Sequence, residues 1–398
     1  MSSAAYVPLP IRRSLFGLPP ELERVRTHQP VARVVLPNGA RVWLVTGYAE
    51  IREVLGDHRR FLSDGRHAPD PHLAGGDAPT PPGPARHGHL THYDLPDHRR
   101  LRTMIAPAFR KSEVARLRPK IETFTAEAIT RTAAAGPGVD LVRSFSFPVP
   151  AQVICELLGI PYEDRAQFEE RIRVRFDGRA GRAARDAALW ESMAYTERLV
   201  AGQRARPGNG LIGSLVRQHG DEIDDHEMAG VADLLLLGGF ETTAHMLSLG
   251  ALLLMRRPEL VAAVSDPSRA DQTVEELLRY LSVVQTGVPR VAAEECTLGG
   301  QRIARGERVA CLIPSGNRDQ VFGDPEDVRT DRQAPQHLAF GHGIHYCVGA
   351  PLARAELTCA LPLLFRELPG LRPAVPDSEL GFRSFAAVYG LDELPVTW

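Results

Sequence analysis

The chain has 398 residues, of which 43% are hydrophobic and 24% charged, which is typical of a globular protein that folds in water. Lys and Arg number 47 and Asp and Glu 49, so the net charge gives no reason to expect binding to nucleic acid or to an acidic membrane. The five cysteines contain no CxxC pair, which argues against a disulfide framework or a zinc ribbon and fits a reducing cytosol. The N-terminal residues lack the apolar run of a signal peptide, and we therefore expect a cytoplasmic protein.

In chain order, the first predicted element is a β-hairpin. Residues 31–46 contain two β-type runs around Asn38 and Gly39, a pair that strongly favours a hairpin turn. A short helix is predicted over residues 49–62. The stretch 63–97 is rich in Pro and Gly and is predicted to be a long loop, of a length that is usually functional or disordered.

Helical periodicity dominates the chain from there to residue 281. Helices are predicted over residues 98–110, 112–135, 148–158, 163–176, 184–205, 209–219, 225–256 and 271–281. The most apolar helix contains Asp233, Glu241 and His245, which favours a buried helix over a membrane span. A second β region is predicted at 296–313 and a last helix at 348–367. No compositional break indicates a linker, so we expect one domain over residues 1–398, mainly α with small β-sheets.

Two adjacent glycines, Gly238 and Gly239, lie in the middle of the helix predicted over 225–256. Each costs about 1 kcal/mol relative to alanine in a helix interior, so their presence requires a reason. The Thr242 hydroxyl can bond to the carbonyl of Gly238 and loosen the helix, leaving room for dioxygen and a water. Glu241 and Thr242 would then form an acid–alcohol pair able to relay protons. Close approach of another helix is the alternative explanation for the glycines.

Cys347 lies in a stretch, residues 340–349, that contains three glycines and precedes a predicted amphipathic helix. Free N–H groups and the dipole at a helix N-terminus stabilise a thiolate. Zinc would need further ligands, and the local histidines lack suitable spacing, whereas a haem needs only one strong axial ligand. A structural cysteine in a Gly-rich turn is the alternative.

These motifs resemble those of the cytochromes P450. The haem-binding loop of that family is matched at Phe340, Gly343, His345, Cys347 and Gly349. Glu276 and Arg279, at i and i+3 on one helical face, resemble its ExxR motif, although a surface ion pair alone would look the same. Residues 238–243 resemble its oxygen-activation motif, with Glu241 in place of the usual Asp. The resemblance spans nearly the whole chain and is closest to class I bacterial P450s of the actinobacterial kind.

The resemblance implies a role for each matching residue. Cys347 is expected to be the axial thiolate ligand of a haem b, and Glu241 and Thr242 the catalytic pair. Haem contacts are expected from His98, Arg102, Gly238, Arg290, Phe340, His345, Cys347 and Gly349, with His98, Arg102, Arg290 and His345 at the propionates. Substrate-pocket walls are expected from Leu90, Leu237, Phe240, Val284, Val288, Phe385 and Ala386. A structural ion cluster is expected from Glu276, Arg279 and Arg332.

The implied activity is insertion of one oxygen atom of O₂ into a hydrophobic small molecule. We expect hydroxylation in secondary-metabolite biosynthesis, with electrons from a ferredoxin and an NAD(P)H-dependent ferredoxin reductase. Aryl coupling, epoxidation and oxidative rearrangement stay open as alternative reactions. A haem sensor or carrier without turnover is a further alternative, against which the pair Glu241 and Thr242 argues. A monomer that binds neither nucleic acid nor membrane is expected.

Two basic segments allow more than one interpretation. Residues 98–120 carry eight Lys or Arg and one acidic residue, which indicates a solvated helix face or, by the resemblance, a docking surface for ferredoxin. Residues 171–185 carry six arginines and one aspartate in the region of the family's substrate-access lid. A solvated lid, recognition of an anionic substrate and docking of an acidic carrier protein that presents the substrate are three competing explanations.

Overall fold

The computed structural model describes residues 7–8, 13, 15–35, 41–64, 87–177, 180–287, 289–383 and 387–398. The helices are α1 Pro20–His28, α2 Tyr48–Gly56, α3 Asp97–Ile105, α4 Lys111–Ala135, α5 Pro148–Leu158, α6 Arg165–Phe176, α7 Arg182–Ala205, α8 Leu211–His219, α9 Asp225–Arg256, α10 Pro258–Ser265, α11 Ala270–Leu281, α12 Ile313–Gly316 and α13 Ala350–Glu367. The strands are β1 Val7–Pro8, β2 Val31–Val35, β3 Arg41–Val45, β4 Phe61–Leu62, β5 Arg290–Ala292, β6 Cys296–Leu298, β7 Gln301–Ile303, β8 Arg308–Cys311, β9 Arg372–Pro373 and β10 Val396–Thr397.

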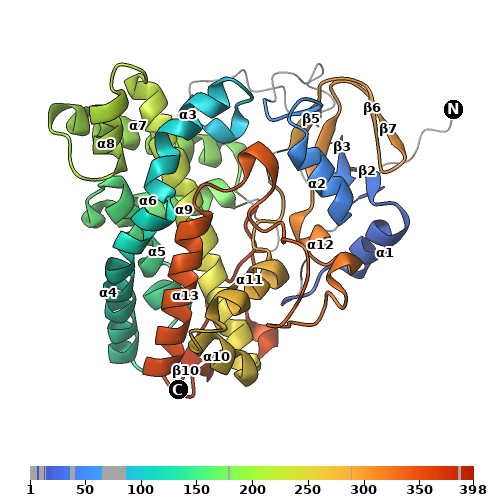
Figure 1. Ribbon diagram of the computed structural model, residues 1–398. Coiled ribbons are helices and arrows are strands. Elements are labelled where there is room, and N and C mark those ends of the chain that lie inside the picture. Colours follow the sequence, from blue (N-terminus) through green and yellow to red (C-terminus); the bar gives the residue numbers. More distant parts are fainter. Residues whose placement is uncertain are drawn as a thin grey trace.

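Helix α9 is the central element of the fold. Asp224 caps its N-terminus by accepting the N–H of Glu227, and residues on nearly every side of the helix are buried. At about 1.5 Å per residue it extends for about 48 Å and packs against α5, α7 and α13. In Figure 1, α4 to α8 lie on one side of α9 and α13, and the sheet with α1, α2 and α12 lies on the other.

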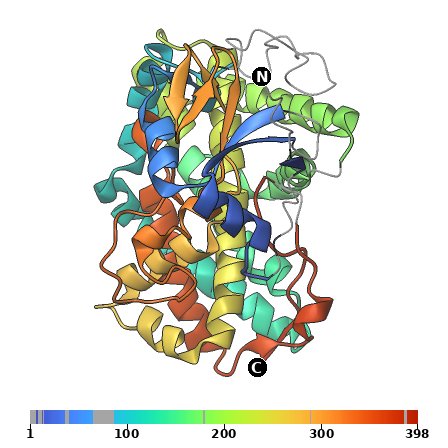
Figure 2. The ribbon, with the colours of Figure 1, turned by 90° about the vertical axis from the view of Figure 1, so that its right-hand side faces the viewer.

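The main sheet joins segments that are far apart in the sequence. Its strand order is β1-β2-β3-β8-β5-β4. The predicted hairpin is confirmed, because β2 pairs antiparallel with β3 and Val31 lies opposite Val45. Strand β8 then lies parallel to β3, with Trp43 opposite Val309. Figure 2 shows the blue hairpin strands together with the orange strands from the C-terminal half.

The structure corrects several predicted boundaries. The helix predicted over 49–62 ends at Gly56, because Asp57 Oδ1 accepts the N–H groups of Arg59 and Arg60 and turns the chain into strand β4. The helix predicted over 98–110 ends as α3 at Ile105, and a 3₁₀ turn that contains Pro107 follows it. Helices α1, α10 and α12 were not predicted. Pro258 does more than end α9, since it is the first residue of α10, where its missing N–H costs nothing.

Candidate active site

The two glycines of α9 have different surroundings. A Cβ atom at Gly238 would meet no atom of the described residues within 4 Å, whereas a Cβ at Gly239 would lie 2.8 Å from Ile154 Cδ1. Gly238 therefore faces open space, and Gly239 allows α5 to approach closely. The Thr242 hydroxyl donates to the carbonyl of Gly238 at 2.7 Å, as the sequence predicts, and Thr242 is partly exposed. The helix is continuous through this stretch, so the expected loosening is not seen, while close approach of another helix is confirmed at Gly239.

Phe240 does not line a pocket. It is fully buried, and its ring packs edge-on against Phe147 at 5.2 Å and Phe168 at 6.0 Å between centroids. These partners precede α5 or belong to α6, and Phe240 is part of the same hydrophobic core as they are. The prediction that Phe240 forms a pocket wall is therefore wrong, because helix packing directs this side chain into the core.

Glu241 is buried in a polar cluster that the sequence did not predict. Its carboxylate is 1% exposed and accepts a hydrogen bond from the guanidinium of Arg383, which lies near the C-terminus. His245, one helical turn further along α9, is fully buried, and its Nε2 lies 3.5 Å from Glu241 Oε1. Glu241 and His245 are four residues apart and so lie on one face of the helix, which could have suggested their contact. Nothing in the local sequence points to Arg383.

The loop around Cys347 is held in shape by backbone contacts. The Cys347 N–H donates to the carbonyl of Phe340 at 2.9 Å, and Gly341 has a φ of +73°. Gly343 has a φ of +71°, and a Cβ there would lie 2.3 Å from the carbonyl oxygen of Leu55 in α2. Both positions therefore require glycine. Helix α13 begins at Ala350, two residues later than the predicted start at residue 348. Cys347 therefore precedes the helix by three residues.

Cys347 combines an exposed side chain with a thiol that the surrounding protein desolvates. The residue is exposed, yet desolvation by the surrounding protein is the largest influence on the thiol and raises its pKa above the ordinary value. The N–H groups of Gly349 and Ala350 and the charges of Arg102 and Arg354 act in the opposite direction. The predicted stabilisation of a thiolate is thus present but smaller than the effect of burial. A coordinated metal ion would deprotonate the thiol outright.

Four residues predicted to contact haem propionates lie close together. The rings of His98 and His345 are 4.2 Å apart between centroids, and His345 Nε2 is 2.8 Å from Ser63 Oγ. Burial, followed by the charge of Arg102, lowers the pKa of His98 to about 4. Burial, followed by the charge of Arg290, lowers the pKa of His345 to about 2. The guanidinium groups of Arg102 and Arg290 therefore lie beside the neutral imidazoles of His98 and His345.

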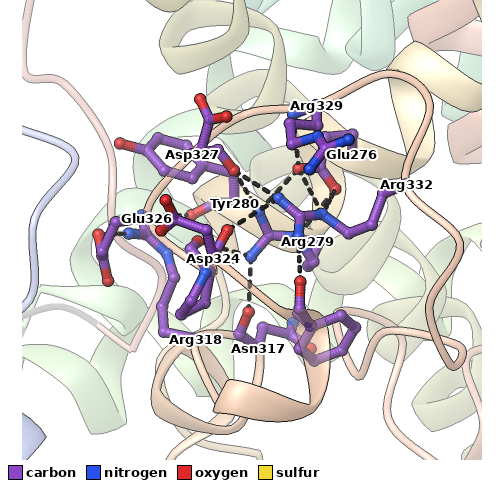
Figure 3. Close-up of polar contacts among 12 residues, drawn as sticks. Glu276, Arg279, Tyr280, Asn317, Arg318, Asp324, Glu326, Asp327, Arg329 and Arg332 are labelled. Carbon is purple, nitrogen blue, oxygen red and sulfur yellow. Dashed lines mark hydrogen bonds and ion pairs between the residues drawn. The ribbon is translucent and has the colours of Figure 1, made fainter.

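Glu276, Arg279 and Arg332 form a buried ion cluster (Figure 3). Arg279 donates two hydrogen bonds to the Glu276 carboxylate at 2.7 and 2.8 Å, and Arg332 Nε donates to it at 3.1 Å. Arg279 also donates to the carbonyl of Asn317, whose side-chain oxygen accepts the N–H of Leu338 at 2.7 Å. Because Leu338 in turn accepts the N–H of Gly341, the cluster is linked to the cysteine loop.

A second network behind the cysteine loop was not predicted. Arg354 of α13 donates to the carboxylate of Glu275 and to the Tyr346 hydroxyl at 3.2 Å, and its guanidinium lies 4.6 Å from the centre of the Phe340 ring. His337 Nε2 lies 3.1 Å from the same Glu275 carboxylate. Although burial opposes it, the contacts with Arg354 and His337 lower the pKa of Glu275 to about 2. This network ties α11 to the loop from a second side.

Comparison with known proteins places this arrangement in a family. Residues 270–369 match the family model described as Cytochrome P450. Cytochrome P450-SU2 of Streptomyces griseolus is 41% identical over 386 residues, covering 96% of this chain and 94% of that protein. The chain belongs to the cytochrome P450 family.

Solved P450 structures agree with this assignment. The mycinamicin VIII C21 methyl hydroxylase MycCI of Micromonospora griseorubida has a TM-score of 0.90 at 33% identity, covering 98% of this chain and all of that one. OxyC, a P450 implicated in an oxidative C–C coupling reaction during vancomycin biosynthesis, has a TM-score of 0.88 at 37% identity, covering 100% of this chain and 99% of that one. The predicted family, its mainly α fold and its enzymatic nature are thereby confirmed. Among the described helices, none combines the length and apolar character needed to cross a bilayer.

A P450 holds its haem through a cysteine thiolate, and the site residues fit such a group. The Arg102 side chain is half-buried and has no hydrogen-bond or carboxylate partner among the described residues. Burial lowers its pKa, and only the charge of Cys347 opposes this effect, so the cation has no carboxylate partner among the described residues. His98 Nε2 is buried and likewise has no partner in the described part of the chain. Haem propionates would supply the missing acceptors, and the open space at Gly238 leaves room near α9.

The other predicted pocket residues are only partly placed. Leu237 and Val284 are partly exposed, and Val284 pairs with Val388 through a β-bridge. Leu90 is 4% exposed and belongs mainly to the core. The predictions for Val288, Phe385 and Ala386 fall outside the described residues.

Some arginines of the segment 171–185 form ion pairs with carboxylates of this P450. Arg175 of α6 makes a two-pronged contact with the buried carboxylate of Asp233 on α9, at 2.7 and 2.8 Å. Arg173 pairs with Glu170 on the surface of the same helix. Arg179 lies outside the described residues. The Arg175 contact attaches α6 to α9 and is one that the sequence did not predict.

Proposed function

We propose that this P450 inserts one oxygen atom of O₂ into a hydrophobic small molecule during natural-product biosynthesis, with Cys347 as the axial ligand of a haem b. The observation that carries the proposal is the exposed Cys347 thiol beside the Arg102 guanidinium, which has no carboxylate partner among the described residues. Bound there, the haem supplies the iron chemistry that activates dioxygen. The names of relatives such as the mycinamicin VIII C21 methyl hydroxylase support the substrate class.

The residues of the chain would bind the haem, orient the thiol and move protons near the haem. Arg102, His98, Arg290 and His345 would hold the propionates, and the hydrogen bonds of the cysteine loop fix the thiol. Thr242 holds a proton on Oγ1 and directs it at the carbonyl of Gly238, from which it can turn toward a ligand. Glu241 is the buried acid that precedes Thr242 in α9 and would take part in the proton relay.

The spectrum of the reduced protein with carbon monoxide tests the cofactor. A strongly red-shifted Soret band in the wild type, lost in Cys347→Ser, is expected because only a thiolate ligand produces it. Cys359→Ser, at a buried cysteine within α13, is the matched control and should keep the band. A histidine-type band in the wild type, or an unchanged band in Cys347→Ser, would overturn the assignment.

The reaction type needs product analysis. OxyC is implicated in oxidative C–C coupling, and this relationship keeps aryl coupling as a second candidate beside hydroxylation. With a candidate substrate, product masses separate the two, since hydroxylation adds one oxygen atom and coupling removes two hydrogens. Incorporation of labelled oxygen from ¹⁸O₂ supports hydroxylation, and its absence from a dehydrogenated product supports coupling. A haem sensor would give no product with either.

The proposal extends to the redox partners, the oligomeric state and the cellular location. We propose electron supply by a ferredoxin and its reductase, docked on the basic segment that starts at α3. Phe109, next to Arg110, lies 3.9 Å from the Cβ position of Gly349, so this segment borders the cysteine loop. A single domain, a monomer and a cytoplasmic location complete the proposal. For residues 171–185, Arg173 and Arg175 already pair with carboxylates of this chain. This favours a solvated lid over recognition of an anionic substrate or carrier protein.

A further inference from the structure

Arg383 connects the C-terminal segment to the acid of α9. Its Nη1 donates to Glu241 Oε1 and lies 2.9 Å from His245 Nε2. The three side chains are 7%, 1% and 0% exposed. They therefore form a closed polar cluster in a hydrophobic interior, and the protonation state of each determines that of the others.

The geometry assigns the protons within this cluster. Burial is the largest influence on His245 and lowers its pKa, while Glu241 acts in the opposite direction. A neutral imidazole has one acceptor nitrogen, and a guanidinium can only donate, so Nε2 accepts from Arg383 and the proton lies on Nδ1, which is buried and has no hydrogen-bond partner among the described residues. The other groups facing His245 are Asp392, which favours its charged form, and the ring of Phe147 at 5.4 Å. A single ion pair, Arg383 with Glu241, thus stands beside a neutral histidine.

The two oxygens of the Glu241 carboxylate are unequal. Oε1 is occupied by Arg383, whereas Oε2 is buried and has no hydrogen-bond partner among the described residues. A buried carboxylate oxygen without a partner is costly unless water or another donor reaches it. Oε2 is therefore the atom at which this acid can exchange a proton.

Arg383 is itself firmly held. Its N–H donates to the carbonyl of Gly390 at 2.9 Å, and its Nη2 donates to the carbonyl of Arg173 in α6 at 3.4 Å. A Cβ atom at Gly390 would lie 1.9 Å from His245 Nδ1, so the C-terminal segment presses directly on the imidazole. These restraints leave the guanidinium little freedom to leave Glu241.

We propose that Arg383 and His245 are positioning residues for the acid–alcohol pair: they keep Glu241 ionised and leave Oε2 as its one proton-exchanging atom. This inference rests on the proposed function. In each exchange Oε2 would take up one proton and release it again, so the carboxylate returns to its ionised form. Without Arg383, the buried cluster would take up one proton, either on His245 or on Glu241, because an unpaired buried carboxylate is unstable.

The test measures protonation in the holoenzyme, in its reduced, carbon monoxide-bound form. Ring-¹⁵N-labelled histidine reports the state of His245, whose signal is the one missing from His245→Asn. Wild type, Arg383→Gln and Arg383→Lys are compared between about pH 6 and about pH 8, around the ordinary histidine pKa. Arg175→Gln is the matched control, because it removes the other buried arginine–carboxylate pair of α9. Infrared spectra, with Glu241→Gln/Arg383→Gln as reference, detect a protonated Glu241.

Wild type, Arg175→Gln and Arg383→Lys are expected to show neutral His245 with its proton on Nδ1. Arg383→Gln is expected to show either an imidazolium signal or a carboxylic-acid band that the double variant lacks, together with a severalfold rise in NADPH electrons lost as hydrogen peroxide. No proton uptake at His245 or Glu241 in Arg383→Gln, or uptake at either of these two residues in Arg175→Gln, would overturn the inference. If Arg383→Gln does not bind haem, the wild-type spectrum still tests the inference. A charged His245, or a neutral His245 with its proton on Nε2, would overturn the inference. The carbon monoxide spectrum of each sample tests the proposed function separately.

Discussion

At the scale of single residues, two neighbours on α9 have opposite environments. Glu241 is buried in an ion pair, whereas Thr242 is partly exposed and, in the described part of the chain, its hydroxyl bonds only to the carbonyl of Gly238. Successive helix residues point about 100° apart, so one residue can belong to the core and the next to the site. Thr242 is thus free to redirect its proton, and Glu241 is the fixed partner.

Removing the Thr242 hydroxyl should separate electron consumption from product formation. With Thr242→Ala we expect product to fall by at least about tenfold, since a positioned proton donor contributes about 10²- to 10⁴-fold, while NADPH oxidation continues and hydrogen peroxide accumulates. Thr242→Ser should retain most of the product. The control is Thr243→Ala, a buried neighbour on another face. Equal product loss in Thr243→Ala would show that helix packing, and not the hydroxyl, is responsible.

Gly343 tests whether the cysteine loop tolerates a side chain. Both Gly343 and Gly370 have a positive φ, of +71° and +80°, but a Cβ at Gly370 meets nothing within 4 Å. Gly343→Ala should therefore destabilise the protein by about 1–3 kcal/mol more than Gly370→Ala, because only the former collides with backbone. Urea unfolding monitored by circular dichroism measures the difference. Equal effects would mean that the loop moves away from α2 at no cost.

At the scale of elements, the cysteine loop depends on two polar networks. Glu276 collects Arg279, Arg332 and the N–H of Arg329, and Arg279 extends the contact to Asn317. On the other side, Glu275 holds Arg354 of α13. No side chain of residues 340–349 is fully buried, although Phe340 and Val348 pack against hydrophobic cores, so these ion pairs contribute to where the thiol lies.

Removing the charge of Glu276 should release this support. Glu276→Gln leaves two buried arginines without their anion, and we expect a loss of about 3–5 kcal/mol in the free energy of unfolding and poor retention of haem. Glu259→Gln removes an exposed ion pair with Arg257 and should change stability by less than about 1 kcal/mol. Urea midpoints and the carbon monoxide band per mole of protein give both readouts. A stable, haem-loaded Glu276→Gln protein would contradict the supporting role.

At the scale of the whole molecule, charge is balanced overall but uneven locally. The basic segment 98–120 contains α3 and the start of α4, where Arg110 and Lys111 are exposed beside the cysteine loop. An acidic ferredoxin placed there would lie on the thiolate side of the haem. Attraction between unlike charges raises association rates and weakens with added salt.

Reversing charge on this surface should therefore slow reduction. Arg110→Glu combined with Arg116→Glu is expected to lower the rate of reduction by ferredoxin at low salt by about tenfold and to remove most of its salt dependence. Arg302→Glu changes an exposed arginine of β7 and should have little effect. Stopped-flow reduction in carbon monoxide, at several salt concentrations, gives these rates. Unchanged rates in the double variant would place the docking surface elsewhere.

The sequence by itself determined what lies within a few helical turns. It predicted α9 over residues 225–256, the bond from Thr242 to Gly238, and the cysteine loop, since all of these depend on neighbouring residues and on spacing along one element. The tertiary structure alone decided the contacts of long range. Arg383 reaches Glu241 across 142 residues, β8 joins β3, and Phe240 turns into the core. Such contacts depend on how helices and strands pack together, and periodicity in the sequence carries no record of which surfaces will meet.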